Sequence, residues 1–390
     1  MRILVWSVHF SIGGGMRLLH NLISAMARQP DVEQIRLVLS PDSLIRNVAE
    51  LRALDKVEMV STQHSIDSDQ NSYLLVGIDV VYYYWPHTHP YHALDRPTVC
   101  TFHDTTMFDY VPPFMDGEQL KGHWILSKKW LDHVTSVVVS SEHVKNRLIA
   151  HFGARHHLAT VVPHAITPIA AQYSSQVSPA TAARIPSKYI IYPSNTSPHK
   201  NHNNLLEALS HWKGRTKCPL VLTGYLTETL RQPFPDCTPQ HSWIPTLIST
   251  IRRTGLVVNR DLYPLGFVGD EDIPALIKNA WALIMPSLSE GGGSYPVEEA
   301  LRLGTPVLCS DIPVMREHLA RHSAKIAWFN PHSPDSIVQA LEDMTGNYDE
   351  YKNAAVAGIH DPAESWDDVA KRYLNVFRDT YWRYYGKLLP

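Results

Sequence analysis

The stretch from residue 284 to residue 307 reads IMPSLSEGGGSYPVEEALRLGTPV. A short apolar run leads to Glu290, three glycines follow, and Pro296 opens a helical pattern that carries Glu298 and Glu299. A strand, a polar turn, a helix and a further strand in this order are typical of a parallel sheet. Glycine N–H groups can meet phosphate or sugar oxygens, and carboxylates accept hydrogen bonds from hydroxyl groups. The stretch therefore predicts a strand-end loop that binds a phosphorylated sugar.

The same alternation of β-rich runs and amphipathic helical patterns extends outward in both directions. A segment rich in Ala, Ser, Pro and Gln, at about 168–187, separates two such series and predicts a linker. We therefore predict an α/β chain of two doubly wound, Rossmann-like domains, at 1–170 and 186–362, that face a cleft. The last helix, at about 363–385, is expected to pack back on the first domain. The expected strands lie at 3–6, 35–39, 80–83, 98–102, 137–139, 160–162, 189–192, 220–222, 262–267, 282–285 and 307–309.

Composition limits the possible function classes. The 390 residues are 44% hydrophobic and 19% charged, as in an ordinary globular protein. A net charge of −3 argues against a general nucleic-acid binder, which normally has a large basic excess. No apolar run approaches the ~20 residues of a membrane span, and the first residues are not typical of a secretory signal. No CxxC or zinc-ligand spacing occurs among the cysteines, which are Cys100, Cys218, Cys237 and Cys309, so we expect no disulfide framework. Reduced cysteines are typical of the cytoplasm. We therefore expect a cytoplasmic protein with at most peripheral membrane contact.

Two segments of the first predicted domain carry candidate chemistry. Gly14 and Gly15, together with Gly13, follow the first strand and open a helix, where free N–H groups can bind a phosphate or a sugar hydroxyl. The spacing is not GxGxxG, so a dinucleotide site is disfavoured, and a plain tight turn explains the glycines as well. His103 and Asp104 end another strand. His103 can donate to a sugar hydroxyl, and Asp104 can hold its tautomer or cap the next segment.

In the second predicted domain, Lys200 follows the strand end and polar turn that contain Asn195. A lysine here can neutralise a diphosphate leaving group, because negative charge grows there when a glycosyl–phosphate bond breaks. An ordinary surface lysine is the simpler interpretation of Lys200 taken alone.

With these residues in place, the chain resembles glycosyltransferase family 4, the retaining GT-B enzymes, over nearly its whole length. The family's motifs occur in the same order: the glycine-rich first turn, the active-site histidine, the phosphate-binding lysine, the base-contacting Gly-Phe-Val and the acidic motif. They correspond here to Gly13–Gly15, His103, Lys200, Gly266-Phe267-Val268, and Glu290 with Glu298 or Glu299.

Three departures from the family pattern affect the interpretation. Ser194-Asn195 occupies the region where the family has an arginine, so the diphosphate would depend on Lys200, backbone amides and either Arg17 or His199. The loop 291–295 is one residue longer than usual, so both Glu298 and Glu299 fit the ribose position. We favour Glu299, because it keeps the helix register. Ala165 replaces a frequent glycine before the linker.

The resemblance implies hexose transfer from a nucleoside diphosphate sugar to a hydroxyl of a glycan or lipid-linked oligosaccharide in polysaccharide biosynthesis, with retention and without a metal. GDP-mannose is favoured as the donor by family-level analogy, with a UDP-hexose as the alternative. The catalytic residues would be His103, Lys200 and Glu290. The donor-binding residues would be Gly14, Gly15, Asn195, Phe267, Val268, Gly291, Gly292, Gly293, Ser294, Glu298 and Glu299.

Other interpretations stay open at this point. A sugar-nucleotide 2-epimerase would use the same architecture without an acceptor, and a non-catalytic sugar-binding module would keep only the site. An HxHxxH pattern can bind zinc, and it contains His87, His89 and His92, with His103 nearby. A basic and aromatic helix face indicates peripheral membrane contact, although packing of this helix in the first domain explains its tryptophans equally well. The face contains Lys121, His123, Trp124, Lys128, Lys129 and Trp130.

Overall fold

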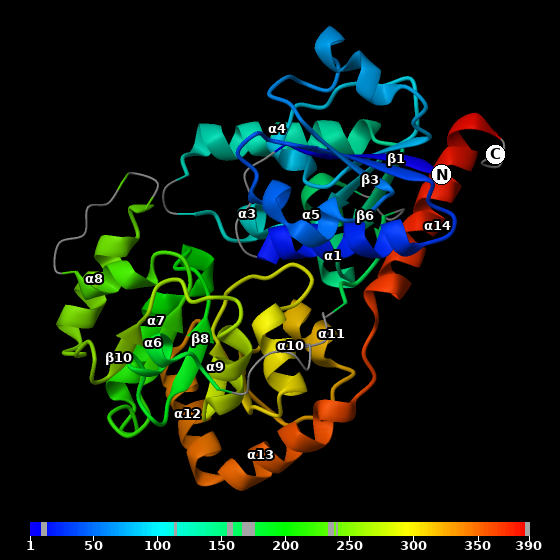
Figure 1. Cartoon of the computed structure of the whole chain (residues 1–390). Coiled ribbons are helices and arrows are strands. Elements are labelled where there is room, and N and C mark those ends of the chain that lie inside the picture. The colour runs from blue at the N-terminus through cyan, green and yellow to red at the C-terminus, as the bar shows by residue number, and fades with distance from the viewer. Residues whose placement is uncertain are drawn as a thin grey trace. The chain divides into compact units, whose positions relative to one another are not determined.

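The computed structural model describes residues 1–8, 14–112, 115–153, 159–165, 176–232, 238 and 241–386. The chain divides into two compact units, and each contains one parallel sheet with helices around it (Figure 1). The first unit comprises Met1–Phe108, Gly117–Thr167 and Ala363–Pro390, and the second comprises Asp109–Asp116 and Pro168–Pro362. Two doubly wound α/β units confirm the predicted fold class.

The first unit has a seven-stranded sheet in the order β3-β2-β1-β4-β5-β6-β7. The strand order reverses between β1 and β4, and ligands of such sheets bind at the carboxyl ends of the strands beside this point. Its strands are β1 (Arg2–Ser7), β2 (Gln34–Leu39), β3 (Val57–Ser61), β4 (Val80–Tyr83), β5 (Thr98–Phe102), β6 (Ser136–Val139) and β7 (Thr160–Val161). Its α-helices are α1 (Gly14–Arg28), α2 (Ala49–Arg52), α3 (Thr106–Asp109), α4 (Gly117–His133), α5 (Glu142–Phe152) and α14 (Trp366–Tyr385).

Two adjacent tyrosines of β4 show how helices cover both faces of the first sheet. Successive side chains of a strand point to opposite faces. Tyr82 packs against Tyr373 and Phe377 of α14, with ring centroids 5.7 and 5.3 Å away. Tyr83 packs against Trp130 of α4 at 4.4 Å. Tyr373 and Phe377 of the last helix are therefore part of the core of this unit.

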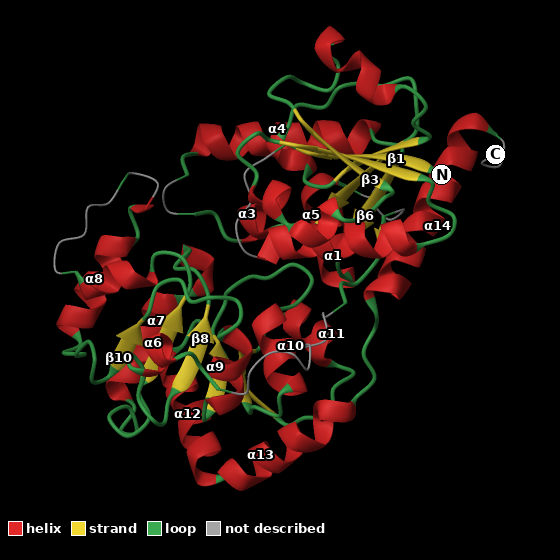
Figure 2. Cartoon of the chain, viewed as in Figure 1, coloured by secondary structure: helices red, strands yellow, loops and turns green. Residues whose placement is uncertain are grey.

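The second unit has a six-stranded sheet in the order β10-β9-β8-β11-β12-β13 (Figure 2). Its strands are β8 (Ile190–Pro193), β9 (Leu220–Thr223), β10 (Leu262–Pro264), β11 (Ala282–Met285), β12 (Val307–Ser310) and β13 (Ile326–Phe329). Its α-helices are α6 (Pro179–Ala182), α7 (His202–His211), α8 (Ile244–Arg253), α9 (Ile273–Asn279), α10 (Tyr295–Arg302), α11 (Pro313–Leu319), α12 (Pro334–Gly346) and α13 (Tyr348–Ala357). The strand order reverses between β8 and β11.

Three local expectations for this unit differ from the structure. The stretch 168–187, predicted as a linker, contains the short helix α6 in its described part, which Ser178 caps by accepting a hydrogen bond from the Thr181 N–H. The strand expected at 262–267 ends at Pro264, because Gly266 has φ +75° and turns the backbone away. The helix expected from Glu298 begins earlier, at Tyr295, with Pro296 in its first turn.

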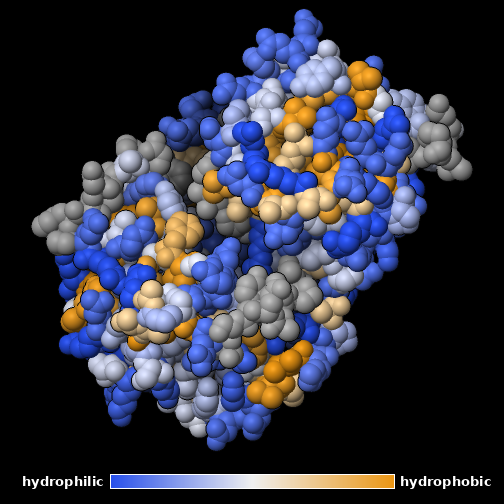
Figure 3. Space-filling model, in the orientation of Figure 1, coloured by the Kyte–Doolittle hydropathy of each residue, from blue (hydrophilic) through white to orange (hydrophobic). Residues whose placement is uncertain are grey.

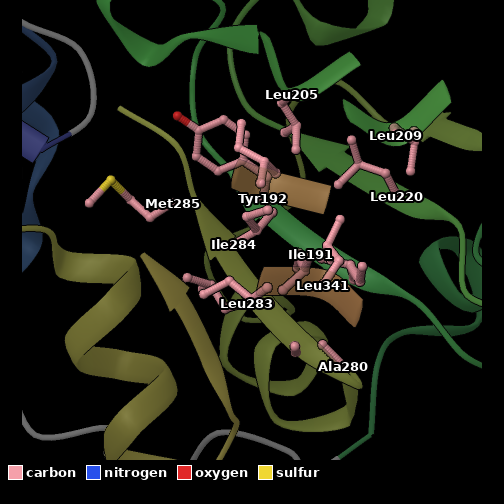
Figure 4. Packing of buried hydrophobic residues seen from close by; sticks show 14 of the residues in the cluster. Ile191, Tyr192, Leu205, Leu209, Leu220, Ala280, Leu283, Ile284, Met285 and Leu341 are labelled. Atoms are coloured by element: carbon pink, nitrogen blue, oxygen red, sulfur yellow. The ribbon is translucent and has the colours of Figure 1, made fainter. Parts of the chain in front are cut away.

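The two central strands of the second sheet are buried on both faces. Ile191 of β8 and Leu283 of β11 are both fully buried. Figure 4 shows them in one cluster with Leu209 of α7 and Leu341 of α12. Burial of an aliphatic side chain contributes about 1.5–3 kcal/mol. The ends of β8 and β11 are therefore rigid supports for the loops that follow them.

The face shown in Figure 3 carries separate hydrophobic patches among hydrophilic residues. None of the helices in the described ranges is long and apolar enough to span a membrane. The expected basic and aromatic face of α4 forms only in part, because Trp130 is fully buried. Trp124 is 37% exposed and stacks on Phe152, with ring centroids 5.6 Å apart, and Ile125 beside it is 52% exposed.

Candidate functional site

The loops after β8 and β11 are joined into one structure at the point where the strand order reverses. The Leu288 N–H donates to the carbonyl of His199 over 2.8 Å. The Asn201 side-chain amide donates to the carbonyl of Pro286 over 2.8 Å, and Asn201 has the left-handed φ of 59° that asparagine tolerates. These bonds bring together two polar segments that are far apart in the sequence.

The centre of this structure is an ion pair between Lys200 and Glu290. The lysine Nζ lies 2.6 Å from the glutamate Oε1, and the two side chains are only 18% and 12% exposed. Tyr192 of β8 supports the lysine, since its hydroxyl donates to the Lys200 carbonyl over 2.8 Å. Charge-assisted hydrogen bonds are strong in such a partly desolvated place. A cation and an anion are thus held side by side at the carboxyl edge of the sheet.

The glycine run that follows Glu290 is required by its surroundings. Gly293 has φ +108°, a conformation that other residues rarely adopt. A Cβ atom at Gly293 would also lie 2.4 Å from the ring of His318. Gly291 and Gly292 are half-buried, and Ser294 is buried at the start of α10. The loop therefore presents backbone rather than side chains in front of the helix N-terminus, as an anion site does.

Glu298 is directed toward two histidines. Nε2 of His318 and Nε2 of His322 each lie 2.9 Å from one of its carboxylate oxygens. On its other side, His322 Nδ1 lies 3.7 Å from Asp361. Burial acts to raise the pKa of Glu298, but the hydrogen bonds and charges of the two histidines outweigh burial and lower this pKa to about 2. Glu298 is thus an ionised, buried structural carboxylate.

Glu299, the next residue of α10, is also buried, with 3% of its surface exposed. Both oxygens of Glu298 are occupied by imidazole groups, so a ribose would have to displace a histidine to bind there. This arrangement argues against Glu298 as a ribose contact.

Fewer of the expected residues can supply positive charge to a diphosphate than the sequence suggested. Burial, followed by the positive charge of Lys200, lowers the pKa of His199 to about 3, so its imidazole is neutral at physiological pH. Asn195 is exposed, and its side-chain oxygen accepts the N–H of Ser197 over 3.0 Å in a local turn. Arg17 lies on α1 in the first unit. Lys200 is therefore the cation that the second unit brings to Glu290.

An aromatic surface lies beyond the ends of β9 and β10. Phe267 is 62% exposed, and Val268 next to it is half-buried. Tyr225 follows β9, with its ring 6.2 Å from Phe267 and 5.8 Å from His241. The Gly266 N–H donates to the Thr227 hydroxyl over 2.9 Å, which fixes the turn before Phe267. These rings can cover a nucleotide base.

In the first unit, His103 is buried where β4 and β5 end. Its Nε2 donates to the Tyr84 carbonyl over 2.9 Å, and its ring stacks on Trp85 at 4.7 Å. The Tyr84 hydroxyl donates to the carbonyl of Gly15 over 2.5 Å. Tyr84 thus joins His103 to the glycine turn, where Gly14 is the first residue of α1; Gly13 lies outside the described residues.

Of the two roles considered for Asp104, the structure shows the cap of the next segment. Asp104 Oδ1 accepts the N–H of Thr106 over 2.9 Å and so caps α3. The carbonyl of Tyr84 places the proton of a neutral His103 on Nε2, which leaves Nδ1 as the acceptor nitrogen. The neutral ring would therefore accept a hydrogen bond from a sugar hydroxyl through Nδ1 rather than donate one. Ala165, which replaces the glycine frequent in the family before the linker, is fully buried in the first unit.

The histidines considered for zinc are not brought together. His92 pairs with Asp67 over 2.7 Å, whereas His103 stacks on Trp85. Burial is the main cause that lowers the pKa of His87 to about 3 and of His89 to about 4. In the parts of the chain that the structure describes, no three His, Cys, Asp or Glu residues are placed to hold a metal ion.

Several residues of the site have no motif in the sequence. Tyr84 directly follows β4, and Tyr225 comes two residues after the end of β9; this position is the one signal that could have identified them. His318 lies in the last turn of α11, and His322 follows four positions later, beyond the end of this helix. Their partner Glu298 becomes evident only when α10 and α11 are packed together.

Comparisons with known proteins agree with this geometry. Residues 178–361 match the family model described as Glycosyl transferases group 1, which spans most of the second unit. The O-antigen chain mannosyltransferase B of Escherichia coli is 25% identical over 311 residues, covering 76% of this chain and 74% of that protein. The O-antigen chain mannosyltransferase RfbU of Salmonella typhimurium is 31% identical over 86 residues, covering 22% and 24%.

The structure of Anabaena HepE in complex with UDP and glucose superimposes with a TM-score of 0.69 at 16% identity. The superposition covers 97% of this chain and all of that one. At this identity the likeness shows the fold, which is GT-B, as the sequence predicted. The fold, the family match and the mannosyltransferase relatives together support placing this chain among the glycosyltransferases.

Proposed function

We propose that this chain is a retaining glycosyltransferase of the family 4 type. It transfers a hexose from a nucleoside diphosphate sugar to a hydroxyl of a glycan or a lipid-linked oligosaccharide during polysaccharide biosynthesis. The observation that carries the proposal is the ion pair of Lys200 and Glu290 at 2.6 Å, beside the glycine run. In a nucleoside diphosphate sugar, the hexose hydroxyl groups lie next to the negatively charged β-phosphate. The carboxylate of Glu290 can therefore bind the hydroxyl groups while the ammonium of Lys200 binds the phosphate.

The two charges have separate tasks in this proposal. The ammonium of Lys200 stabilises the negative charge that grows on the departing diphosphate. The carboxylate of Glu290 accepts hydrogen bonds from hexose hydroxyls and so orients the anomeric carbon. Because Lys200 is already held by Glu290, the donor meets a positioned cation and little reorganisation is needed. The acceptor hydroxyl attacks on the face that the diphosphate leaves, and an oxygen of the leaving group takes its proton.

The remaining donor contacts are part of the same proposal. Glu299 binds the ribose hydroxyls, and Phe267 with Val268 contacts the base. Gly291, Gly292, Gly293 and the N–H groups that begin α10 at Ser294 face the phosphates or the hexose. From the first unit, Gly14, Gly15 and His103 are the residues proposed to contact the donor, and Asn195 is a further proposed donor contact in the second unit. Lysine and helix N–H groups supply the positive charge, so the proposed reaction requires no metal.

GDP-mannose is the donor that we favour. The support is that similar proteins from Escherichia coli and Salmonella typhimurium are named mannosyltransferases. A UDP-hexose is the second candidate, because the similar Anabaena structure holds UDP and glucose.

A panel of nucleoside diphosphate sugars, incubated with oligosaccharide acceptors in the presence of EDTA, tests the proposal. We expect GDP-mannose to be consumed and the product linkage to have the anomeric configuration of the donor by NMR. An inverted product would refute the mechanism. Release of a free 2-epimer of the donor sugar without an acceptor would instead identify an epimerase.

Substitution of the ion pair tests the site itself. We expect Lys200→Ala and Glu290→Ala each to reduce kcat by about 100-fold or more, the size of the loss when one preorganised charge-stabilising group is removed. Lys213→Ala is the matched control, because Lys213 is an exposed lysine of the same unit and lies away from the loops. Turnover of both site variants at the rate of the control would refute the assignment.

Peripheral contact of a cytoplasmic enzyme with the inner membrane face is a further part of this proposal. Its support is limited to the exposed positions of α4: Lys121, Trp124, Ile125 and Lys129. Co-sedimentation with vesicles of anionic lipid should decrease in a Trp124→Ala, Ile125→Ala double variant. Equal sedimentation of the variant and the unsubstituted chain would exclude this face.

A further inference from the structure

The second unit has a pocket at the edge of its sheet opposite to Lys200 and Glu290. The pocket has a volume of about 650 Å³ and is lined by residues that lead into β8 and β11 and by residues of α9, α12 and α13. All strands of this sheet are parallel, so β8 and β11 enter the sheet at this edge and leave it at the Lys200–Glu290 edge. The lining residues are Ser187, Lys188, Lys278, Asn279, Ala280, Trp281, Thr345, Tyr348 and Lys352.

Three lysines from three separate elements line the pocket, and its lining contains no acidic residue. Lys188 precedes β8, Lys278 belongs to α9 and Lys352 belongs to α13. The acids nearest to the lining residues in the sequence are Asp343, Asp349 and Glu350. Asp343 accepts hydrogen bonds from the Tyr351 hydroxyl and the Asn347 side-chain amide. Asp349 is exposed and outside the lining, and Glu350 is paired with Lys325 over 2.8 Å. The pocket therefore concentrates positive charge that the protein does not neutralise within the lining.

The three ammonium groups differ in how far they are engaged. Lys352 is half-buried and donates to the carbonyl of Gly304 over 2.7 Å, and burial lowers its pKa. The Lys188 Nζ lies 5.4 Å from the ring centroid of Trp281, as in a cation–π contact. Lys278 is exposed and makes no ion pair or hydrogen bond within the described ranges. Two of the three lysines are thus available to an anion.

The wall of the pocket is a column of stacked rings. Trp212 and Trp281 stack at 6.3 Å with 25° between their planes, and Trp281 and Tyr348 stack at 5.0 Å with 12°. The Tyr348 hydroxyl donates to the Trp281 carbonyl over 3.0 Å, so the outermost ring of the column is held in one orientation. A fixed, half-buried tyrosine ring is a surface on which a sugar or base ring can lie.

We propose that this pocket binds a small molecule that carries both a phosphate group and a ring, either a hexose phosphate or a nucleoside monophosphate. The phosphate lies between Lys188 and Lys278, and the ring lies against Tyr348. The pocket volume is within the range of small-molecule sites. This ligand is separate from the donor, because the donor loops leave the sheet at the other edge.

Calorimetric titration of the full chain with mannose 6-phosphate and with adenosine 5′-monophosphate tests the proposal. Each titration is repeated in Lys200→Ala, so that binding at the proposed donor site is recognised by its loss in that variant. We expect saturable binding that survives Lys200→Ala and weakens as salt is added. The tighter of the two probes identifies whether a sugar or a base occupies the pocket. Binding that disappears completely in Lys200→Ala would overturn the proposal.

Two pairs of variants locate the binding site. Lys188→Ala with Lys278→Ala should weaken binding by about tenfold or more, because two charge-assisted contacts are lost. Lys352 is left unchanged, since it supports Gly304. Lys213→Ala with Lys217→Ala removes the same charge from exposed positions outside the lining and should leave binding unchanged. Equal affinity of the two double variants would overturn the proposal.

The ring contact has its own pair of variants. Tyr348→Phe keeps the ring and should bind the tighter probe like the unsubstituted chain, whereas Tyr348→Leu should bind it several-fold more weakly. Inorganic pyrophosphate, which has no ring, should bind equally well to both. Unchanged binding of the tighter probe by Tyr348→Leu would refute the contribution of the ring.

Discussion

Replacement of Glu298 by glutamine tests the buried carboxylate and separates its charge from its shape. Glutamine has nearly the same volume and can still bond to one histidine, so the main loss is the negative charge between His318 and His322. The fall of the Glu298 pKa from 4.5 to about 2 corresponds to about 3 kcal/mol of preference for the charged form in the folded chain. We therefore expect Glu298→Gln to lower the free energy of unfolding by about 3 kcal/mol at pH 7, a large part of a typical total.

The same reasoning predicts how this difference depends on pH. The folded-state pKa of Glu298 is depressed, so its contribution is fully present above the ordinary pKa of 4.5 and is lost as the pH falls through about 2. The difference between the unsubstituted chain and Glu298→Gln should be about 1.4 kcal/mol smaller at pH 3.5 than at pH 7. Glutamine carries no titrating group, so only the unsubstituted chain loses this contribution.

Urea unfolding of both proteins at the two pH values, followed by tryptophan fluorescence, measures this difference. Glu342→Gln is the matched control, because Glu342 is an exposed glutamate of the same unit; its effect should stay within about 0.5 kcal/mol. A difference for Glu298→Gln that is the same at pH 7 and pH 3.5 would show that the charge of this carboxylate does not stabilise the fold.

Three further predictions follow from single contacts. Phe267→Ala should raise the KM for the donor several-fold with little change in kcat, because the 62% exposed ring contacts only the base in our proposal. Steady-state kinetics measures both constants, and an unchanged KM would contradict the contact with the base. Tyr84→Phe removes the 2.5 Å bond to the Gly15 carbonyl and should lower kcat about tenfold or less while circular dichroism stays unchanged; unaltered kinetics would separate this bond from catalysis. Trp130→Ala should destabilise the first unit by about 3–5 kcal/mol, since the fully buried ring packs on Tyr83; a loss below about 1 kcal/mol in urea unfolding would contradict its place in the core.

Local patterns in the sequence were sufficient for the fold class and for the identity of the candidate loops. Apolar runs such as 282–285 stand out because strands of a parallel sheet are buried on both faces. The polar and glycine residues after each run mark the carboxyl ends of strands, where such sheets bind ligands. For that reason Lys200, Glu290 and His103 could be selected before their surroundings were known.

Strands β3 and β13 had no such signal, because they contain partly exposed positions and lie at sheet edges. The one-residue ambiguity between Glu298 and Glu299 was also beyond the pattern alone. Neighbouring helix residues point in different directions, and only the packing of α10 against His318 and His322 shows which carboxylate is engaged. For the same reason the pattern left open whether Trp130 faces a membrane or packs inside the first domain.

The sequence by itself determined which residues are strand ends, helix starts and loops, because these depend on side-chain period and turn chemistry within about ten residues. Tertiary structure alone decided which strand ends meet. Lys200 and Glu290 are 90 residues apart in the chain and make a 2.6 Å contact because β8 and β11 are neighbours in the sheet. Strand order is set by the burial of whole sheet faces against helices, and no local pattern contains that information.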